Sequence, residues 1–150
     1  MDKIVLNMDF IDWIHIIDEK GTPVVVFETY KQGNSDINEA LLSNLLVGLK
    51  SIAAGLTYNE IKIVNIGNKK FYMMKEDQSD YTFIFKVDIE KKFETAIPLL
   101  KEVKELFLYK YFGLLRNKPA HEKENYYESI KEDIKKILNM EKPNAKELID

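Results

Sequence analysis

The stretch IDWIHIIDEKGTPVVVFETY, residues 11–30, sets the fold class of this chain. Two runs of β-branched and aromatic residues flank the segment DEKGTP, whose charges, glycine and proline are typical of a turn. The pattern predicts a β-hairpin. Pro23 has no backbone N–H to donate, which suits the start of a strand or a sheet edge, so we expect the second strand to lie at an edge.

The apolar period changes to that of a helix after the hairpin. Between Asp36 and Leu56 apolar residues recur every three or four positions, and Ser35 or Asp36 can cap the start of this helix. Three strand-like runs follow near 60–66, 69–75 and 81–88. The short polar connections between them predict a three-stranded meander.

Runs of consecutive apolar residues within the strands, such as 24–27 and 83–85, indicate a sheet that is covered on both faces. The cover for the second face comes from the C-terminal part, where apolar spacing predicts one helix near 93–107 and another over 124–140. Pro98 is close enough to the start of the first of these to be tolerated there. The segment RNKPAHEKE between them reads as a loop.

The sequence therefore predicts an α/β fold of the α+β three-layer kind, with the element order β-β-α-β-β-β-α-α. We expect a five-stranded antiparallel sheet with one long helix on one face and the C-terminal helices on the other. At 150 residues, a single domain over 1–140 is expected. Residues 141–150 have little to pack and are expected to form a loosely ordered tail.

Composition restricts the classes of function. With 22 basic and 25 acidic side chains the net charge is −3, which argues against nucleic acid as a partner. Arg116 is the one arginine, so bidentate clamps on phosphate are almost absent. The lack of cysteine excludes a disulfide framework and a thiolate nucleophile. No apolar run approaches the roughly 18 residues of a membrane span, and MDKIVLNMDF does not resemble a signal peptide, so we expect a cytoplasmic protein.

The residues that could carry chemistry predict no catalytic, metal or cofactor site. His15 reads as a packed strand histidine with a locally bonded ring, and His121 as part of an exposed loop. Six single glycines form no phosphate-binding loop. The acidic residues are either a strand apart or crowded in a turn where solvated charge is usual; they are Asp9, Asp12, Asp18, Glu76, Asp77 and Asp80. We therefore predict that the protein is not an enzyme.

The first helix carries more apolar surface than one covered face requires. If Ile37, Leu41, Leu45 and Ile52 face the sheet, a second apolar side of the helix, which we call its flank, lies about 100° away around the helix axis. This flank consists of Leu42, Leu46 and Ala53. It either packs beneath a neighbouring loop or strand, or forms a protein interface.

The hairpin WIHIIDEKGTPVVVFETY, the helix NEALLSNLLVGLKSIAAGL, the meander and the two final helices together resemble the longin domain over roughly residues 9–140. The likeness is to stand-alone longin-type proteins of archaea in particular. The related roadblock domain normally has a helix before its first strand, which MDKIVLNM is too short to supply. The resemblance implies the sheet order 2-1-5-4-3 and a protein-interaction platform for a Ras-like small GTPase or a membrane-trafficking complex.

In that sheet order the third strand is an edge, and Ile61 and Ile63 would extend the apolar flank of the helix into one interface. A homodimer, or a pair with a related longin or roadblock protein, would suit it. The alternative function is a PAS-like sensor of a small ligand. An internal cavity of several hundred Å3 would favour the sensor.

Overall fold

A computed structural model describes residues 11–28, 39–66, 69–88 and 93–139 of the chain. The elements are β1 (Ile11–Ile17), β2 (Pro23–Glu28), α2 (Glu39–Ala54), β3 (Ile61–Ile66), β4 (Lys69–Lys75), β5 (Thr82–Asp88), α3 (Phe93–Leu106), the π-helical segment η2 (Phe107–Phe112), α4 (Gly113–Leu115) and α5 (Ala120–Asn139). The order of strands and helices is the predicted one. The expected tail over 141–150 lies outside the described residues.

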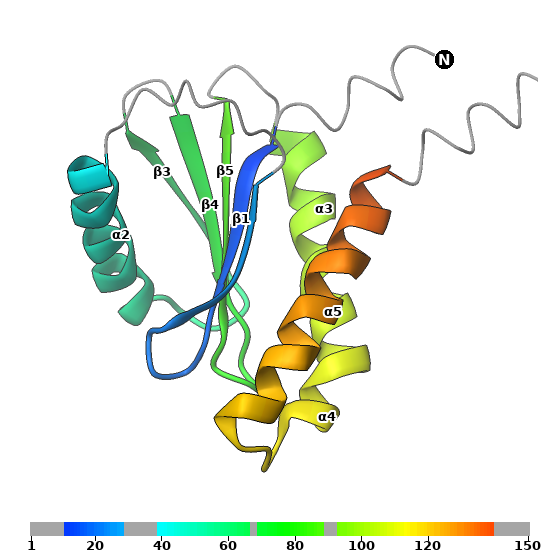
Figure 1. The fold of residues 1–150 in the computed structure, drawn as a ribbon. Coiled ribbons are helices and arrows are strands. Elements are labelled where there is room, and N and C mark those ends of the chain that lie inside the picture. The colour runs from blue at the N-terminus through cyan, green and yellow to red at the C-terminus, as the bar shows by residue number, and fades with distance from the viewer. Residues whose placement is uncertain (1–10, 29–38, 67–68, 89–92, 140–150) are drawn as a thin grey trace, which may run out of the picture.

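The five strands form one antiparallel sheet in the order β2-β1-β5-β4-β3, as the longin resemblance implies. β2 and β3 are therefore the two edges (Figure 1). Pro23 is the first residue of β2, where its missing N–H interrupts no interior ladder, so the edge prediction for this strand is confirmed.

Helices cover both faces of the sheet, which confirms the three-layer prediction (Figure 1). On one face, Leu49 of α2 is buried with Trp13 of β1, Phe71 of β4 and Ile84 of β5. On the other face, a larger core joins the sheet to α3, η2 and α5. Phe107 is fully buried there, with its ring centroid 4.7 Å from that of Tyr81. Apolar side chains thus project from both faces of the central strands, as the unbroken apolar runs predict.

The helix that begins at Phe93 continues past its predicted end near 107, through η2 and α4 to Leu115. Phe107, Tyr111 and Leu115 are buried at intervals of four residues. Two such intervals exceed two ordinary α-helical turns, and a wide π-helical turn keeps all three residues on the side that faces the core. Pro98 lies inside α3, beyond its first turn.

α5 begins at Ala120, so part of the segment predicted as a loop is helical. His121 lies in the first turn of this helix and not in a loop, although it is exposed as expected. Pro119 explains the earlier start, because a proline fixes the backbone angle that a first helical turn needs. Its carbonyl accepts hydrogen bonds from the backbone N–H of Glu122 and of Lys123, at 3.0 and 3.1 Å.

Buried tyrosines attach α5 to the rest of the molecule. The hydroxyls of Tyr81, which directly precedes β5, and of Tyr127 in α5 lie 2.9 Å apart. They connect the end of the β4–β5 turn to α5. The Tyr111 hydroxyl donates to Asp133 at 2.5 Å, and Lys110 donates to the same carboxylate oxygen at 2.8 Å. Burial alone would raise the pKa of Asp133, but the hydrogen bonds from Lys110 and Tyr111 outweigh it and hold the pKa below its ordinary value.

Candidate functional site

The edge strand β3 is the most open regular element of the described sheet. Among the described residues it pairs with β4 alone, in a continuous register from Ile61↔Met74 to Ile66↔Lys69. None of its six residues is fully buried. Ile63 is 37% exposed and Ile66 is 41% exposed. An open edge with exposed isoleucines offers both main-chain hydrogen bonds and apolar area to a partner.

The register shows which sheet face each β3 side chain occupies, because paired residues in an antiparallel ladder share a face. Ile61 and Ile63 pair with Met74 and Tyr72, which belong to the core on the α3 and α5 side. Val64 instead packs with the core under α2. Ile61 and Ile63 therefore lie on the face opposite to α2, and they do not extend a flank of that helix as the sequence led us to expect.

Ala53 also differs from its expected position. Its exposed fraction is 5%, so it is buried and adds nothing to an exposed flank. Leu49, one turn earlier, is buried in the core under α2, whereas Ile52 is half-buried. The helix is thus rotated toward the residues that the sequence assigned to its flank. The side chains of Leu42 and Leu46 lie outside the described ones, so their part in an interface stays a prediction.

The outward side of α2 exposes an apolar residue, and Lys50, the one charged residue of this helix whose side chain is described, is half-exposed. Val47 is 65% exposed, the second largest exposure among the large hydrophobic residues described. The other exposed residues of the helix whose side chains are described are small or polar, namely Asn44, Gly48, Ser51 and Ala54. The sequence did not lead us to predict that Val47 and Ile66 are exposed. Val47 lies off the apolar stripe by helical spacing, which was a usable signal, whereas the exposure of Ile66 depends on the edge position of its strand.

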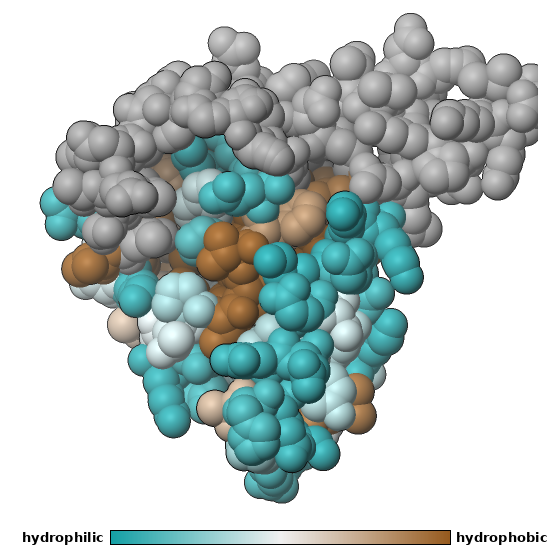
Figure 2. All heavy atoms as spheres, viewed as in Figure 1, coloured by the Kyte–Doolittle hydropathy of each residue, from teal (hydrophilic) through white to brown (hydrophobic). Residues whose placement is uncertain are grey.

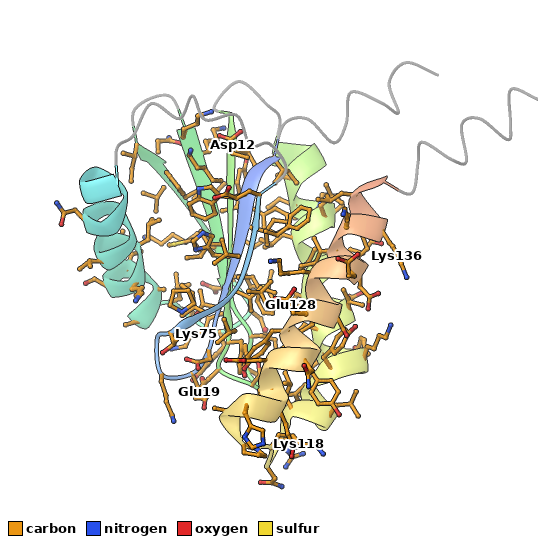
Figure 3. All side chains as sticks on the ribbon, in the orientation of Figure 1. Asp12, Glu19, Lys75, Lys118, Glu128 and Lys136 are labelled. Carbon is orange, nitrogen blue, oxygen red and sulfur yellow. The ribbon has the colours of Figure 1, made fainter. Side chains whose placement is uncertain are left out.

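Asp12 and Asp18, two of the carboxylates singled out in the sequence, have structural roles. Asp12 forms ion pairs with Lys69 at 2.7 Å and with Lys86 at 3.4 Å, linking three strands at one end of the sheet (Figure 3). Asp18 accepts hydrogen bonds from two backbone N–H groups of its own turn, both at 2.9 Å. Across the described ranges, no group of His, Cys, Asp and Glu residues could hold a metal ion.

Glu76 is not a solvated turn charge as its position in the sequence suggested. Its exposed fraction is 2%, and one carboxylate oxygen accepts from the Ser79 backbone N–H at 2.8 Å and from the Ser79 hydroxyl at 2.7 Å. The other oxygen accepts from the Gln78 N–H at 3.1 Å. Asp80, in the same turn, accepts a hydrogen bond from the Tyr58 hydroxyl. Glu76 thus closes the β4–β5 turn and Asp80 ties it to Tyr58, and neither carboxylate pairs with a second acid among the described residues.

His15 is packed inside the sheet, as predicted, but its ring is not fully bonded. Its exposed fraction is 6%, and its centroid lies 4.0 Å from that of Trp13. Within the described part of the chain, Nδ1 has no hydrogen-bond partner. Burial lowers the pKa of His15 to about 4, so the ring is neutral near pH 7. It is a core residue.

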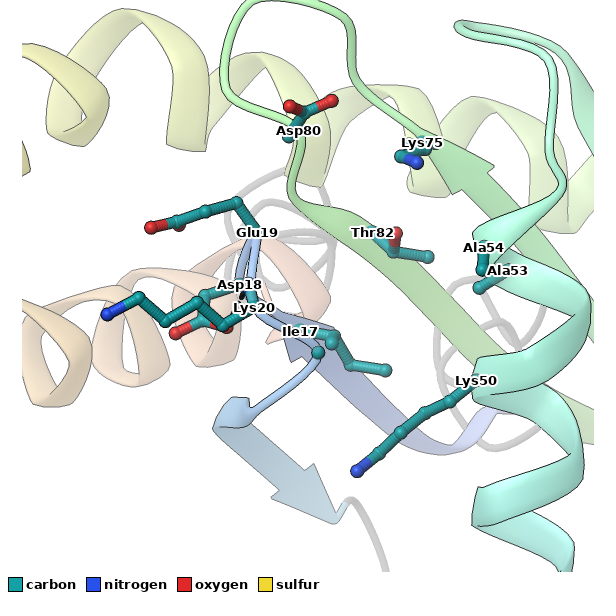
Figure 4. A pocket seen from close by; sticks show the side chains of 11 residues that line it. Ile17, Asp18, Glu19, Lys20, Lys50, Ala53, Ala54, Lys75, Asp80 and Thr82 are labelled. Atoms are coloured by element: carbon teal, nitrogen blue, oxygen red, sulfur yellow. Dashed lines mark hydrogen bonds between the residues drawn. The ribbon is translucent and has the colours of Figure 1, made fainter.

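A pocket of about 200 Å3 opens between the β1–β2 turn and the C-terminal end of α2. Figure 4 shows Ile17, Ala53 and Thr82 at its interior, with Lys50 and Asp80 toward its rim. A small-ligand sensor needs an enclosed and mostly apolar cavity. This open pocket with a charged rim is not of that kind.

No helix in the described ranges is long and apolar enough to cross a membrane. The sequence matches no protein-family model and no curated protein. Among solved structures, it is similar to MglC from Myxococcus xanthus, with 19% sequence identity and a TM-score of 0.44, over 63% of this chain and 82% of that one. Neither the identity nor the TM-score is high enough to transfer a partner or an activity from MglC to this chain.

Proposed function

We propose that this protein is a non-catalytic interaction module of the longin and roadblock type, which binds a second protein domain along the edge strand β3. The observation that carries the proposal is the open edge itself. β3 has β4 as its one strand neighbour in the described sheet and exposes Ile63 on one face and Ile66 on the other. A partner strand would bury apolar side chains on both faces of the extended sheet while it pairs with the main chain.

The exposed Val47 on α2 supports the same proposal. Val47 presents an apolar group away from the sheet, and the exposed α2 residues whose side chains are described are otherwise small or polar. The half-exposed Lys50 lies at the rim of the pocket near the end of the helix. A second copy of this chain, or a related domain, is the simplest occupant, because two such edges can pair with each other.

The wider role that we propose is a platform for a Ras-like small GTPase, which is what the longin resemblance implies. Arg116 is the one residue that could act as an arginine finger on a bound GTPase. It is exposed, with its guanidinium 5.6 Å from the centroid of the Phe112 ring. Arg116 directly follows α4, and Figure 1 shows α4 at the opposite end of the molecule from β3. We therefore expect recruitment of a GTPase rather than stimulated hydrolysis.

The test introduces a charge at the edge. Ile63→Asp places a carboxylate where a partner strand would cover it, so light scattering should show at least about a tenfold weaker self-association. Because Ile63 is 37% exposed, the melting temperature should change little. Leu114→Asp is the matched control, since Leu114 is 46% exposed on α4, away from the edge.

Two results would overturn the proposal. One is a wild-type protein that stays monomeric at high concentration and retains no related domain from a mixture. The other is an equal loss of association in Ile63→Asp and Leu114→Asp, which would show that added charge acts without regard to position.

A further inference from the structure

The described sheet has two edges, and β3 is the edge that a second copy of this chain can approach more freely. The other edge, β2, is also apolar. Val26 is 39% exposed, and Figure 2 shows hydrophobic surface over the β1–β2 hairpin, bordered by hydrophilic residues. However, α5 packs against β2, whereas β3 packs chiefly against β4. A second sheet can therefore extend this one at β3 without displacing α5.

The hydrogen bonds of β4 show which of its main-chain groups face β3. The Lys75 carbonyl accepts a hydrogen bond from the backbone N–H of Asn59, on the β3 side, at 2.7 Å. The next residue, Glu76, instead donates its N–H to the carbonyl of Tyr81, on the β5 side, at 2.9 Å. Main-chain groups point to alternate sides along a strand, so the odd-numbered residues of β4 bond to β3.

The register between the two strands transfers this assignment to β3. The odd-numbered residues of β4 pair with the even-numbered residues of β3. The N–H and C=O groups that face the open edge therefore belong to Ile61, Ile63 and Asn65. The extended edge begins after Asn59, because that residue has a left-handed backbone with a φ of 63° and turns its N–H toward β4.

These outward groups restrict how two copies can pair. Two identical edges related by a two-fold axis run antiparallel, and each outward residue must lie opposite an outward residue. The three registers with the most overlap place Lys62, Ile63 or Val64 opposite its own copy. With Ile63 at the axis, Ile61 lies opposite Asn65 of the second copy, so all outward residues are paired. The other two registers each leave one outward residue without a partner in β3, and Lys62 at the axis also places like charges directly opposite each other.

We infer that two copies of this chain pair through β3 in a single register, with Ile63 of each copy opposite Ile63 of the other. This inference rests on the proposed function, because it names the pairing at the same edge. Ile63, which is 37% exposed in the single chain, would be covered by its own copy. Both α2 helices would lie on the same face of the joined sheet, since a two-fold axis between paired antiparallel strands is perpendicular to the sheet.

Single-cysteine trapping measures the register directly, because the chain has no cysteine of its own. Ile63→Cys, Lys62→Cys and Val64→Cys each report the register that has this residue at the axis. Directly opposite residues have Cα atoms about 4.5–5.5 Å apart, which a disulfide can bridge. In the inferred register the other two positions lie about 7–8 Å from their own copies. Leu114→Cys, which is 46% exposed on α4, gives the rate of chance collision.

Under mild oxidation, Ile63→Cys should form a cross-linked dimer about tenfold faster than Lys62→Cys or Val64→Cys. Mixing Ile61→Cys with Asn65→Cys gives a second measurement. Each of these two lies at least about 13 Å from its own copy, which is four residues at about 3.3 Å each, so neither should cross-link with itself. Together they should form a disulfide-linked heterodimer, which mass spectrometry identifies.

Light scattering under reducing conditions separates failure of the register from failure of the proposed function. If the variants associate but Lys62→Cys or Val64→Cys cross-links fastest, the inferred register is wrong and association through β3 stands. If they associate and no β3 position reacts faster than Leu114→Cys, another surface carries the association and both are wrong. A wild-type protein that stays monomeric at high concentration also overturns both.

Discussion

At the scale of single residues, the sequence predicted a packed His15 but not its ring environment. An apolar strand context is enough to predict burial, whereas a missing Nδ1 partner depends on which groups the neighbouring strands present. Burial lowers the pKa of His15 to about 4, against about 6.5 in the unfolded chain. The unfolded state therefore binds the proton more readily, so the stability associated with the neutral ring is fully present above pH 6.5 and is lost as the pH falls toward 4.

His15→Phe should flatten this pH dependence, because a phenyl ring can stack on Trp13 but cannot take up a proton. Between pH 6.5 and 4 the wild type should lose about 3 kcal/mol more unfolding free energy than the variant, by linkage. His121→Gln is the control, since His121 is exposed on α5. Denaturant unfolding at several pH values measures the effect, and equal slopes for wild type and His15→Phe would contradict it.

At the scale of elements, turn signals predicted the strands to within about a residue, because glycine, proline and short polar runs interrupt the apolar pattern sharply. Helix ends were less predictable. The segment 108–115 stayed unassigned, because the four-residue interval of Phe107, Tyr111 and Leu115 is sparse and drifts around an α-helix, whereas the π-helical turn that keeps these residues on one side has no sequence signal of its own. The face of α2 was also misjudged, because several apolar stripes on this helix compete and packing against the sheet decides between them.

The π-helical segment gives a prediction at this scale. Tyr111 is 3% exposed and bonds to Asp133, whereas Tyr109, two residues earlier, is 80% exposed. Tyr111→Phe should lower the unfolding free energy by about 1.5–3 kcal/mol, because a hydrogen bond to a charged group is lost between η2 and α5. Tyr109→Phe should change it by less than about 0.5 kcal/mol. Denaturant unfolding measures the free energy of unfolding of both variants. Equal losses would show that the hydrogen bond from Tyr111 to Asp133 does not hold α5 in place.

At the scale of the whole molecule, layers and element order followed from apolar runs, but the strand order came from a family resemblance and not from the residues. The two edges follow from that order. The side of the sheet on which Ile61 and Ile63 lie could not be predicted, because a period of two separates the faces without saying which face α2 covers. The register with β4 supplies that information and divides the predicted interface between two faces.

Hydrogen exchange of the wild-type protein at two concentrations tests association through β3 most directly. In a concentrated sample, a partner strand should pair with the outer side of β3, so the amides of residues 61–66 should exchange more slowly than in a dilute sample. The amides of residues 23–28 should exchange at the same rate in both samples, because the proposed partner pairs with the opposite edge of the sheet. Unchanged exchange over 61–66 in a sample that light scattering shows to be associated would contradict the account.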